Sequence, residues 1–397
     1  MTGSSASVNP LRSLGSTVYV PAAIYGIGTG AAAPVLTLRA LELGASVALA
    51  GLTVALVGLG QVVGDLRAGQ VVARLGERRS VILASSIATA GALLCIVAST
   101  VLWLCGGILL VGLANSVWGL ARQNYLSLAV PFEWRARAMS LFGGTMRLGF
   151  FVGPLLGAAA IWFLGVRGGF VVQLIAVVVA GILMARLPDP PGSGAQPQPH
   201  SLSTVFGEHV RLLATLGTGS LLLGVARSSR EAVLPLWAHH LGASAGTASL
   251  IFGVGAALDV VCSYPAGHLM DRFGRTFVAI PSILVLALSY LLIPLTTSIL
   301  AFTVVAIAMG VGNGFGNGVI MTLGADVAPP SGRAEFLAAW RLTHDAGFLL
   351  GPLSIAFVVA IAPLSAGIFV VSGMSAAGAG LLARYIPRYT REISSTP

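Results

Sequence analysis

The chain has 397 residues, of which 56% are hydrophobic and only 9% are charged. A soluble domain carries about 25% charged residues, so this composition excludes a water-soluble protein and predicts an integral membrane protein. The net charge of +9 does not indicate nucleic-acid binding, because the arginines that produce it are scattered among apolar segments. The three cysteines lack the paired spacing of a metal site, and we expect neither a metal nor another cofactor.

Apolar runs of membrane-spanning length recur along the whole chain. A transmembrane helix needs roughly 20 apolar residues. On this measure the sequence predicts an all-α membrane protein with twelve transmembrane helices, near residues 17–38, 46–72, 80–100, 103–128, 138–163, 167–187, 211–237, 244–270, 277–296, 299–327, 334–361 and 363–386. The first run is too long for the core of a signal peptide, so we expect it to be retained.

A segment rich in Pro, Gly and Gln separates the sixth predicted helix from the seventh. Such a composition does not hold a helix and is typical of a linker. We therefore expect an N-terminal six-helix bundle at 1–187, a cytoplasmic linker at 188–207 and a C-terminal six-helix bundle at 208–397.

The two predicted bundles are related in sequence at a constant offset of 198 positions. Glycines, asparagines, prolines and arginines recur at this offset without a gap, as in the pairs Gly69/Gly267, Arg74/Arg272, Gly76/Gly274, Gly112/Gly310, Asn115/Asn313, Gly149/Gly347, Gly153/Gly351 and Pro154/Pro352. Two repeats of this size predict halves related by a pseudo-twofold axis.

The distribution of arginine predicts the orientation in the membrane. An even number of helices puts both chain ends on one side, together with the basic loops at 74–79 and 272–275. Only Arg39 and Arg167 then lie in loops on the other side. The positive-inside rule therefore predicts a multi-pass protein of the cell membrane with cytoplasmic N- and C-termini.

The two basic loops carry a motif. Residues Gly267, Asp271, Arg272, Gly274 and Arg275 resemble the signature between the second and third helices of each half in the major facilitator superfamily. The first-half copy holds Gly69, Arg74 and Gly76, but Ala73 stands where the family has aspartate. The resemblance implies a twelve-helix transporter that works by alternating access, without enzymatic activity.

The motif glycines also have a direct physical reading. We expect Gly69 and Gly267 to let a neighbouring helix approach closely, and Gly76 and Gly274 to permit a tight turn with positive φ. We expect Asp271 to lie near the N-terminus of a helix from the other half, where the helix dipole favours an anion.

A second motif lies in the fifth predicted helix. Gly149, Gly153, Pro154 and Gly157 are similar to the motif associated with proton-coupled antiporters of the same superfamily, which implies a bacterial exporter of the drug/proton antiporter type. The four-residue spacing of the glycines predicts close helix packing, and Pro154 predicts a bend. For the glycine-rich run at 310–318 we expect helix packing or a hinge.

Ionisable residues inside the predicted spans carry the functional signal, because each is costly in the membrane and needs a reason. These residues are Asp65, Arg67, Arg122, Arg147, Arg227, Arg230, Glu231, Asp259, Arg341, His344 and Asp345. All lie on helices that border the central cavity in the superfamily, so the resemblance implies a polar cavity.

Four carboxylates are candidates for proton coupling: Asp259, Asp65, Asp345 and Glu231. Asp259 ranks first because no other charge lies within four positions of it. We expect Arg147 to pair with Asp345 across the halves, and Arg227 to pair with Glu231 at i, i+4. Beside Asp345, His344 is either part of a proton relay or a polar neighbour.

The candidates for the substrate cavity are Arg122, Arg147, Arg227, Arg230, Arg341, His344, Trp118, Asn115, Asn313 and Asn317. Arginine stays charged and binds carboxylate or phosphate with a forked set of donors. The excess of arginine over carboxylate therefore favours an anionic or zwitterionic substrate.

Taken with the resemblance, these residues predict a secondary active transporter that exports a small organic molecule in exchange for protons. The partners expected are this small molecule, protons and the lipid bilayer, with no nucleic acid and with the monomer as the functional unit. Two alternatives stay open. One is uptake of an organic acid or other nutrient by proton symport or facilitated diffusion, and the other is a membrane sensor or scaffold.

Overall fold

The computed structural model describes residues 14–130, 132–186, 207–329 and 333–394, which are helical with short connections and contain no strand. The predicted linker falls largely outside this part of the chain. In order, the elements are η1 Gly15–Tyr19, α2 Val20–Ala32, α3 Val35–Glu42, α4 Val47–Val97, α5 Val101–Ala129, α6 Phe132–Leu164, α7 Arg167–Ala185, α9 Val210–Leu212, η2 Leu213–Gly217, α10 Thr218–His240, α11 Ala245–Phe273, α12 Arg275–Leu292, η3 Ile293–Leu295, α13 Ile299–Phe315, α14 Val319–Val327, α15 Arg333–Val359 and α16 Leu364–Ser394.

Within the described residues, eleven helical segments are long and apolar enough to cross a membrane, where the sequence predicts twelve. The difference comes from α4, which holds the second and third predicted spans. Its 51 residues would extend about 77 Å as one straight helix, far more than a bilayer core of about 30 Å. Its backbone leaves helical geometry at Gly76, with φ 75° and ψ 169°.

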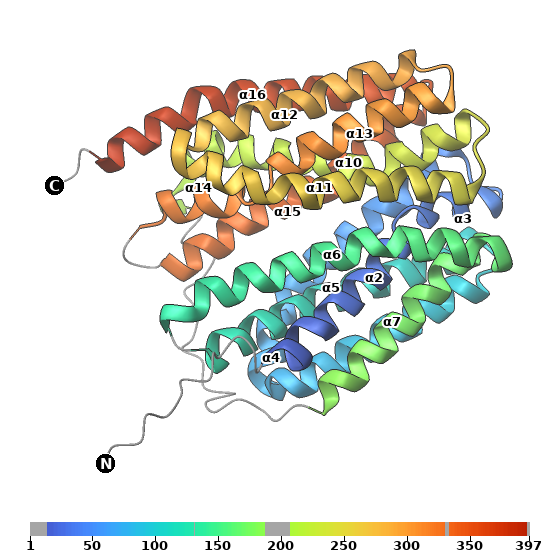
Figure 1. The fold of residues 1–397 in the computed structure, drawn as a ribbon, viewed down its shortest axis with the longest axis horizontal. Coiled ribbons are helices and arrows are strands. Elements are labelled where there is room, and N and C mark those ends of the chain that lie inside the picture. The colour runs from blue at the N-terminus through green and yellow to red at the C-terminus, as the bar shows by residue number, and fades with distance from the viewer. Residues whose placement is uncertain (1–13, 131, 187–206, 330–332, 395–397) are drawn as a thin grey trace.

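The helices form two groups in space (Figure 1). Helices α2, α4, α5, α6 and α7 lie together, and α10 to α16 lie beside them. Contacts of α4 with α15 and of α6 with α11 join the two groups. Between these two contacts, the side chains of both groups face one another.

Glycine allows the closest helix contacts inside each group. A Cβ atom at Gly149 of α6 would collide with the backbone of Ala23 in α2. In the same way, a Cβ at Gly347 of α15 would collide with the backbone of Leu221 in α10. Both glycines and both carbonyls are separated by the same 198 positions, so the sequence repeat is also a repeat of contacts.

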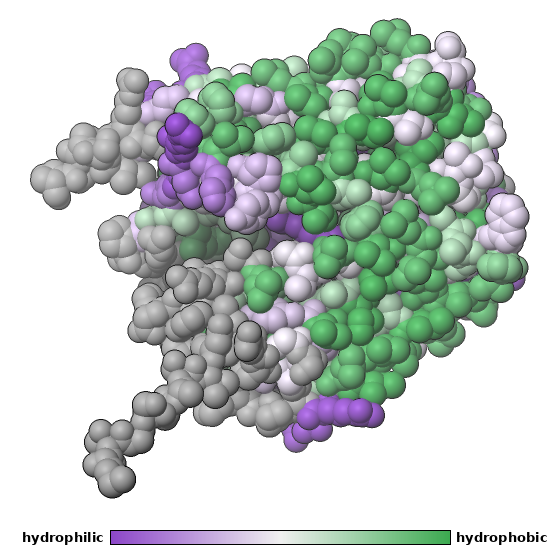
Figure 2. Space-filling model, in the orientation of Figure 1, coloured by the Kyte–Doolittle hydropathy of each residue, from purple (hydrophilic) through white to green (hydrophobic). Residues whose placement is uncertain are grey.

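The outer surface is apolar. Leu102, Trp162 and Phe163 are each more than 80% exposed, and Figure 2 shows hydrophobic residues over much of the visible face. Water does not tolerate a continuous apolar surface of this kind, whereas the hydrocarbon of a bilayer does. The protein is therefore a multi-pass integral membrane protein, as the composition predicts.

The glycine-rich run in the tenth predicted span contains both features expected of it. Gly310 packs so closely on α11 that a Cβ would collide with the Gly255 backbone. Gly318 has φ +83°, and α13 ends at Phe315 before α14 begins at Val319. The run is thus both a packing surface and a break in the helix.

Candidate functional site

A partly buried carboxylate on α11, that of Asp259, is held by two amides. Asn313 and Asn317 each donate a hydrogen bond from Nδ2 to Asp259, one to Oδ2 and the other to Oδ1. Asn313 belongs to α13, and Asn317 lies in the break that follows this helix. The two helices come close enough because Gly314 has no side chain, and a Cβ there would lie 2.6 Å from the Asp259 carbonyl oxygen.

Arg230 of α10 approaches the same carboxylate. Its Nη2 lies 3.6 Å from Oδ2 of Asp259, and the guanidinium stands over the Phe252 ring at 5.6 Å. The side chain is only 5% exposed, and its Nε and Nη1 are buried without a hydrogen-bond partner. Arg230 therefore keeps donor capacity that the protein itself does not use.

Two further arginines complete the group that we call the Asp259 cluster: Asp259, Asn313, Asn317, Arg147, Arg227 and Arg230. Arg227 donates from Nη2 to Oδ1 of Asn317. Arg147, on α6, interacts electrostatically with both Asp259 and Arg227. The cluster therefore draws its charges from both groups of helices.

Neighbouring side chains complete the surroundings of the cluster. Asn317 also donates to Oγ of Ser263 over 2.6 Å. Glu231 interacts electrostatically with Arg230. The Tyr290 hydroxyl of α12 donates to the Ala226 carbonyl over 2.5 Å and so joins α12 to α10. Three arginines thus face two carboxylates, which leaves the region positively charged.

Two ion pairs expected from the sequence do not form, and their arginines have other partners. Arg227 binds Asn317 rather than Glu231, because the break after α13 brings that amide to α10. Asp345 pairs with Arg341 one turn away, with Nε and Oδ2 3.3 Å apart, rather than with Arg147. Arg147 instead interacts electrostatically with Asp259, because α6 packs against α11.

A second polar group, the Asp65 cluster, consists of Asp65, Ser116, Gln123, Arg341 and Asp345. Ser116 donates to Oδ1 of Asp65, and this carboxylate interacts electrostatically with Arg341 and Asp345. Nη1 of Arg341 also donates to Oε1 of Gln123 over 3.2 Å, which links α15 to α5. Arg341 is 58% exposed, so this cluster is open to water.

The exposure of the Asp65 cluster agrees with the shape of the molecule. Figure 2 shows a hollow between the two groups of helices, on the side where the last described helix ends. At the other end a cleft of about 500 Å³ lies among the helix connections, and its lining includes Ser46, Trp237, His239, His240 and Ser365.

His344, the neighbour of Asp345 in the chain, contacts the backbone of α10. Its Nδ1 lies 2.9 Å from the Ser220 carbonyl oxygen, and its ring meets the edge of Phe348. The Nδ1 side of the imidazole is thus held by the backbone of the neighbouring helix.

Three of the cavity candidates lie together elsewhere, in a stack inside the first group of helices. Tyr25 stacks on Trp118 with ring centroids 4.0 Å apart and donates to Oδ1 of Asn115 over 2.5 Å. Arg122 lies over the Trp118 and Tyr125 rings at 5.7 and 5.6 Å. These residues hold helices of one group together and are not part of the Asp259 cluster.

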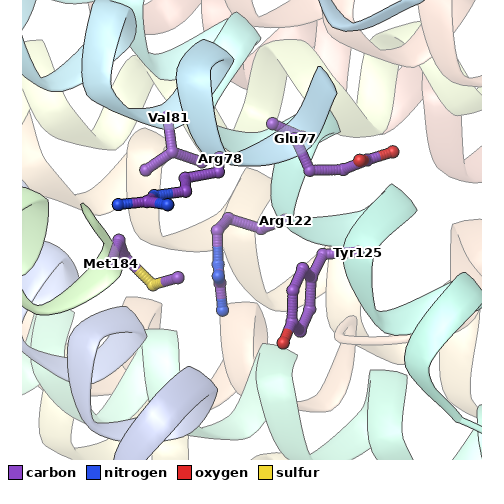
Figure 3. A pocket seen from close by; sticks show the side chains of 7 residues that line it. Glu77, Arg78, Val81, Arg122, Tyr125 and Met184 are labelled. Carbon is purple, nitrogen blue, oxygen red and sulfur yellow. The ribbon is translucent and has the colours of Figure 1, made fainter. Parts of the chain in front are cut away.

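Arg122 is 1% exposed and also lines a very small pocket (Figure 3). Its labelled neighbours there include Glu77, Arg78 and Met184, and the Glu77 carboxylate points away from the Arg122 guanidinium. Nδ2 of Asn124 donates to Oε1 of Glu77 over 2.6 Å. The pocket is too tight for an organic ligand.

The basic turns agree only partly with their expected roles. Gly76 and Gly274 have φ of 75° and 89°, as the tight turns require. A Cβ at Gly69 or Gly267 would meet nothing within 4 Å, so the predicted close approach of a neighbouring helix at these two glycines was wrong.

The acidic residue of the second turn is not docked on another helix. The side chain of Asp271 is 83% exposed, and its ion pair among the described residues is with the Arg275 guanidinium, at 3.7 Å. Arg275 instead makes its short ion pair with Asp326 of α14, over 2.9 Å. The contact therefore stays within one group of helices and does not bridge the two.

The fifth-helix motif has the predicted packing role. Gly149, Gly153 and Gly157 lie along α2, where side chains at the first two would collide with its backbone. Pro154 lies inside α6 and contacts α11 beside Gly253. The motif therefore joins α6 to its own group on one face and to the other group on the next.

Some residues in or beside the two clusters are not among those predicted from the sequence. Ser263 had a usable signal, because it follows Asp259 by four residues and so shares its helix face. Ser116 and Phe252 had none, because serine and phenylalanine are ordinary in apolar helices and only the packing shows their partners.

Comparison with known sequences identifies relatives. The family model described as the Major Facilitator Superfamily matches residues 19–229 and 216–397. The chain is 28% identical over 236 residues to the uncharacterized MFS-type transporter YcaD of Escherichia coli O45:K1. That match covers 55% of this chain and 56% of the relative.

Solved structures share the fold over nearly the whole chain. The nucleoside transporter NupG superposes with a TM-score of 0.77 at 15% identity, covering 95% of this chain and all of that one. A bacterial homologue of the lysosomal transporter Spinster, in an inward-facing conformation, gives 0.73 at 16% identity, covering 98% of both chains. A D-xylose–proton symporter gives 0.71 at 15% identity, covering 94% of this chain and 98% of that one. With its family model matched almost end to end, this chain belongs to the Major Facilitator Superfamily.

Proposed function

We propose that the chain crosses the membrane twelve times, in two six-helix halves at 1–187 and 208–397 joined by a cytoplasmic linker. On this proposal α4 is two crossings that meet at the turn of Gly76. The repeat of helix contacts at an offset of 198 positions supports a pseudo-twofold relation between the halves. Transport then proceeds by rocking of the halves around a site between them.

The transported molecule is a small organic compound with an anionic group, either an organic anion or a zwitterion. The Asp259 cluster is the observation that carries this proposal. Arg147, Arg227 and Arg230 are arginines at membrane depth, where a charge is retained only for a purpose. Their forked donors match carboxylate and phosphate, and Arg230 has donors without a partner in the protein.

Protons are the coupling ion of this proposal, with Asp259 as the first carrier and Asp65, Asp345 and Glu231 as further candidates. Asp259 is favoured because it interacts with Arg230 in one half and Arg147 in the other. A change of its charge is therefore felt on both sides of the site. Export in exchange for protons is the first direction, supported by the antiporter-like motif on α6.

A second candidate is uptake of an organic acid together with protons. The excess of arginine in the Asp259 cluster favours it, since an organic acid enters such a site more readily as its anion. A sensor or scaffold has no use for these buried charges, and the family assignment argues against it.

Flux measurements in vesicles of phosphatidylethanolamine and phosphatidylglycerol test the proposal. The purified protein is reconstituted, a pH gradient is imposed, and a mixture of small organic acids and amino acids is followed by mass spectrometry. Movement driven by the gradient supports coupled transport, and its direction separates export from uptake. A solute that moves only down its own gradient, at the same rate with and without the pH gradient, contradicts proton coupling.

A further inference from the structure

We propose that the site holds its substrate at both ends, as a zwitterion whose anionic group binds the arginines of the Asp259 cluster and whose ammonium group binds the carboxylates of the Asp65 cluster. The inference rests on the proposed function and narrows it, because a plain organic anion would use only one of the two clusters. The two charges of such a molecule stand several bonds apart, as in an ω-amino acid.

The two clusters carry opposite excess charge. In and beside the Asp259 cluster, three arginines stand against the carboxylates of Asp259 and Glu231, which leaves one excess positive charge when both acids are ionised. In the Asp65 cluster, the carboxylates of Asp65 and Asp345 stand against the guanidinium of Arg341, which leaves one excess negative charge. Each cluster therefore attracts a group of the opposite sign, and together they match a molecule that carries both.

The carboxylates of the Asp65 cluster are accessible to a ligand. The side chain of Asp345 is 24% exposed, and Asp65 is exposed as well. Arg341 meets Asp345 at Oδ2, and Ser116 donates to Asp65 at Oδ1. A carboxylate has two oxygens with about four lone-pair positions, so both acids keep acceptor capacity. An ammonium group brings three donors and can bind to both carboxylates at once.

Arginines of the Asp259 cluster are accessible in the same way. Arg147 and Arg227 are partly exposed, whereas Arg230 is buried beside Asp259. The bond from Nη2 of Arg227 to Asn317 takes one of the five N–H donors that a guanidinium carries. The forked donors of these arginines suit a carboxylate or phosphate of the ligand.

His344 shows that the two clusters are neighbours. It interacts electrostatically with Arg227 of the Asp259 cluster and with Arg341 of the Asp65 cluster. The helices that carry these arginines, α10 and α15, pack against each other, so about one helix spacing of 8–10 Å separates them. An α-amino acid, with its charges on adjacent groups, reaches one cluster only, whereas a ligand with a chain of about four to six carbon atoms reaches both.

Each cluster also draws on both groups of helices. Asp65 lies on α4 of the first group and Asp345 on α15 of the second. Arg147 lies on α6 of the first group and Arg227 on α10 of the second. A ligand bound at both ends therefore crosses the boundary between the groups at two places, and its charges contact residues that move relative to one another when the halves rock.

Binding measurements on the purified full-length protein in detergent at neutral pH test the inference. The probes share one chain length: 5-aminopentanoate is a zwitterion, pentanoate is an anion, and pentylamine, protonated at this pH, is a cation. We expect the dissociation constant of 5-aminopentanoate to be at least about tenfold below that of either other probe, because a hydrogen bond to a charged group contributes about this much.

Variants of each cluster separate the two ends of the ligand. Asp345→Asn or Asp65→Asn leaves the Asp65 cluster without excess charge, so 5-aminopentanoate and pentanoate should bind alike. Arg147→Gln should weaken both of these probes about tenfold and keep their ratio. Glu208→Gln removes an exposed carboxylate outside both clusters and should behave as the unaltered protein does. If the Asp65 cluster served only to join helices, its variants would weaken every probe by the same factor.

Chain length gives a second measurement that needs no variant. Glycine, 4-aminobutanoate, 5-aminopentanoate and 6-aminohexanoate carry the same two charges at increasing separation. We expect glycine to bind at least about tenfold more weakly than the best of the longer probes, because it reaches one cluster only.

Four results would overturn the inference: pentanoate bound as tightly as 5-aminopentanoate, glycine bound as tightly as the longer probes, a zwitterion preference that survives in both aspartate variants, or no binding of any zwitterion. None of these touches the proposed function, which stands or falls on gradient-driven flux in vesicles. Gradient-driven flux of a plain organic anion would keep the proposed function and remove this inference.

Discussion

Gly149 of α6 lies directly against the carbonyl oxygen of Ala23 in α2, with no room for a side chain between the two backbones. Gly347 of α15 meets the carbonyl of Leu221 in α10 in the same way. Helix packing in a membrane depends on such close approach, because lipid offers no hydrophobic drive for one helix to bind another.

Replacement of either glycine by alanine should therefore destabilise the protein. We expect Gly149→Ala and Gly347→Ala to cost about 1–3 kcal/mol each, the usual penalty of overpacking. The measurement is the thermal unfolding midpoint of the purified protein. Gly143→Ala on the same helix is the matched control, since a Cβ there meets nothing. An equal effect at Gly143 and Gly149 would contradict the packing explanation.

The motif glycines of the basic turns divide into two pairs with opposite expectations. Gly76 and Gly274 have positive φ, where an L-residue costs about 1–2 kcal/mol, so alanine should destabilise there. Gly69 and Gly267 lie inside helices with free space around them, so alanine should be neutral or stabilising by up to about 1 kcal/mol. Unfolding midpoints of the four variants check both statements. Loss of transport in Gly69→Ala, with stability kept, would point to a close contact in another conformation.

The Arg275–Asp326 ion pair should contribute modestly. Both side chains are about a quarter to a third exposed, and pairs of this kind contribute about 0.2–1 kcal/mol. A double-mutant cycle with Arg275→Gln and Asp326→Asn measures the coupling energy from unfolding free energies. Salt should weaken it, because exposed charges are screened. A coupling that is absent at low salt would show that the pair is not formed in solution.

Asn317 should be among the most sensitive positions of the Asp259 cluster. Its amide binds Arg227, Asp259 and Ser263 at once, so Asn317→Ala leaves two partly buried charged groups short of a partner. The cost of such groups is about 1–3 kcal/mol each, and we expect transport to fall at least tenfold. Ser263→Ala removes only one neutral partner and serves as the comparison. Equal flux in the two variants would place Asn317 outside the mechanism.

Asp259→Asn tests proton coupling directly. We expect this variant to lose flux driven by a pH gradient and to keep exchange of substrate across the vesicle membrane, because the amide keeps the shape of the site but cannot titrate. Driven flux at the unaltered rate would remove Asp259 from the coupling pathway and leave Asp65, Asp345 and Glu231. The exposed-carboxylate variant Glu208→Gln should retain driven flux.

The sequence predicted the helices well because their signal is local. A run of apolar residues is sufficient to predict a spanning helix. Gly76 and Gly274 predicted turns with a backbone conformation that only glycine adopts at low cost. Of the charges predicted inside the spans, Arg122 and Arg230 are buried, whereas Arg341 is 58% exposed. These features depend on neighbouring residues along the chain and on whether a segment is apolar enough for lipid. Both can be read from the sequence.

The pairing of those charges was beyond the sequence. Arg227 lies four residues from Glu231, yet it binds the amide of Asn317, because the break after α13 brings this residue to it. Trp118 and Arg122 lie on the fourth predicted helix, which was expected to border the cavity. Both side chains are instead buried inside the first group of helices. Helix rotation and helix breaks set these partners, and neither is written in the spacing of apolar residues.

The break between α13 and α14 separates the two amides that bind Asp259. Asn313 stands on a rigid helix, and Asn317 stands on the turn just beyond it, ahead of Gly318. Straightening this span would carry one amide away from the carboxylate and leave the other in place. The number of hydrogen bonds that Asp259 accepts thus depends on the bend between α13 and α14. A movement of this backbone changes the solvation of the Asp259 side chain.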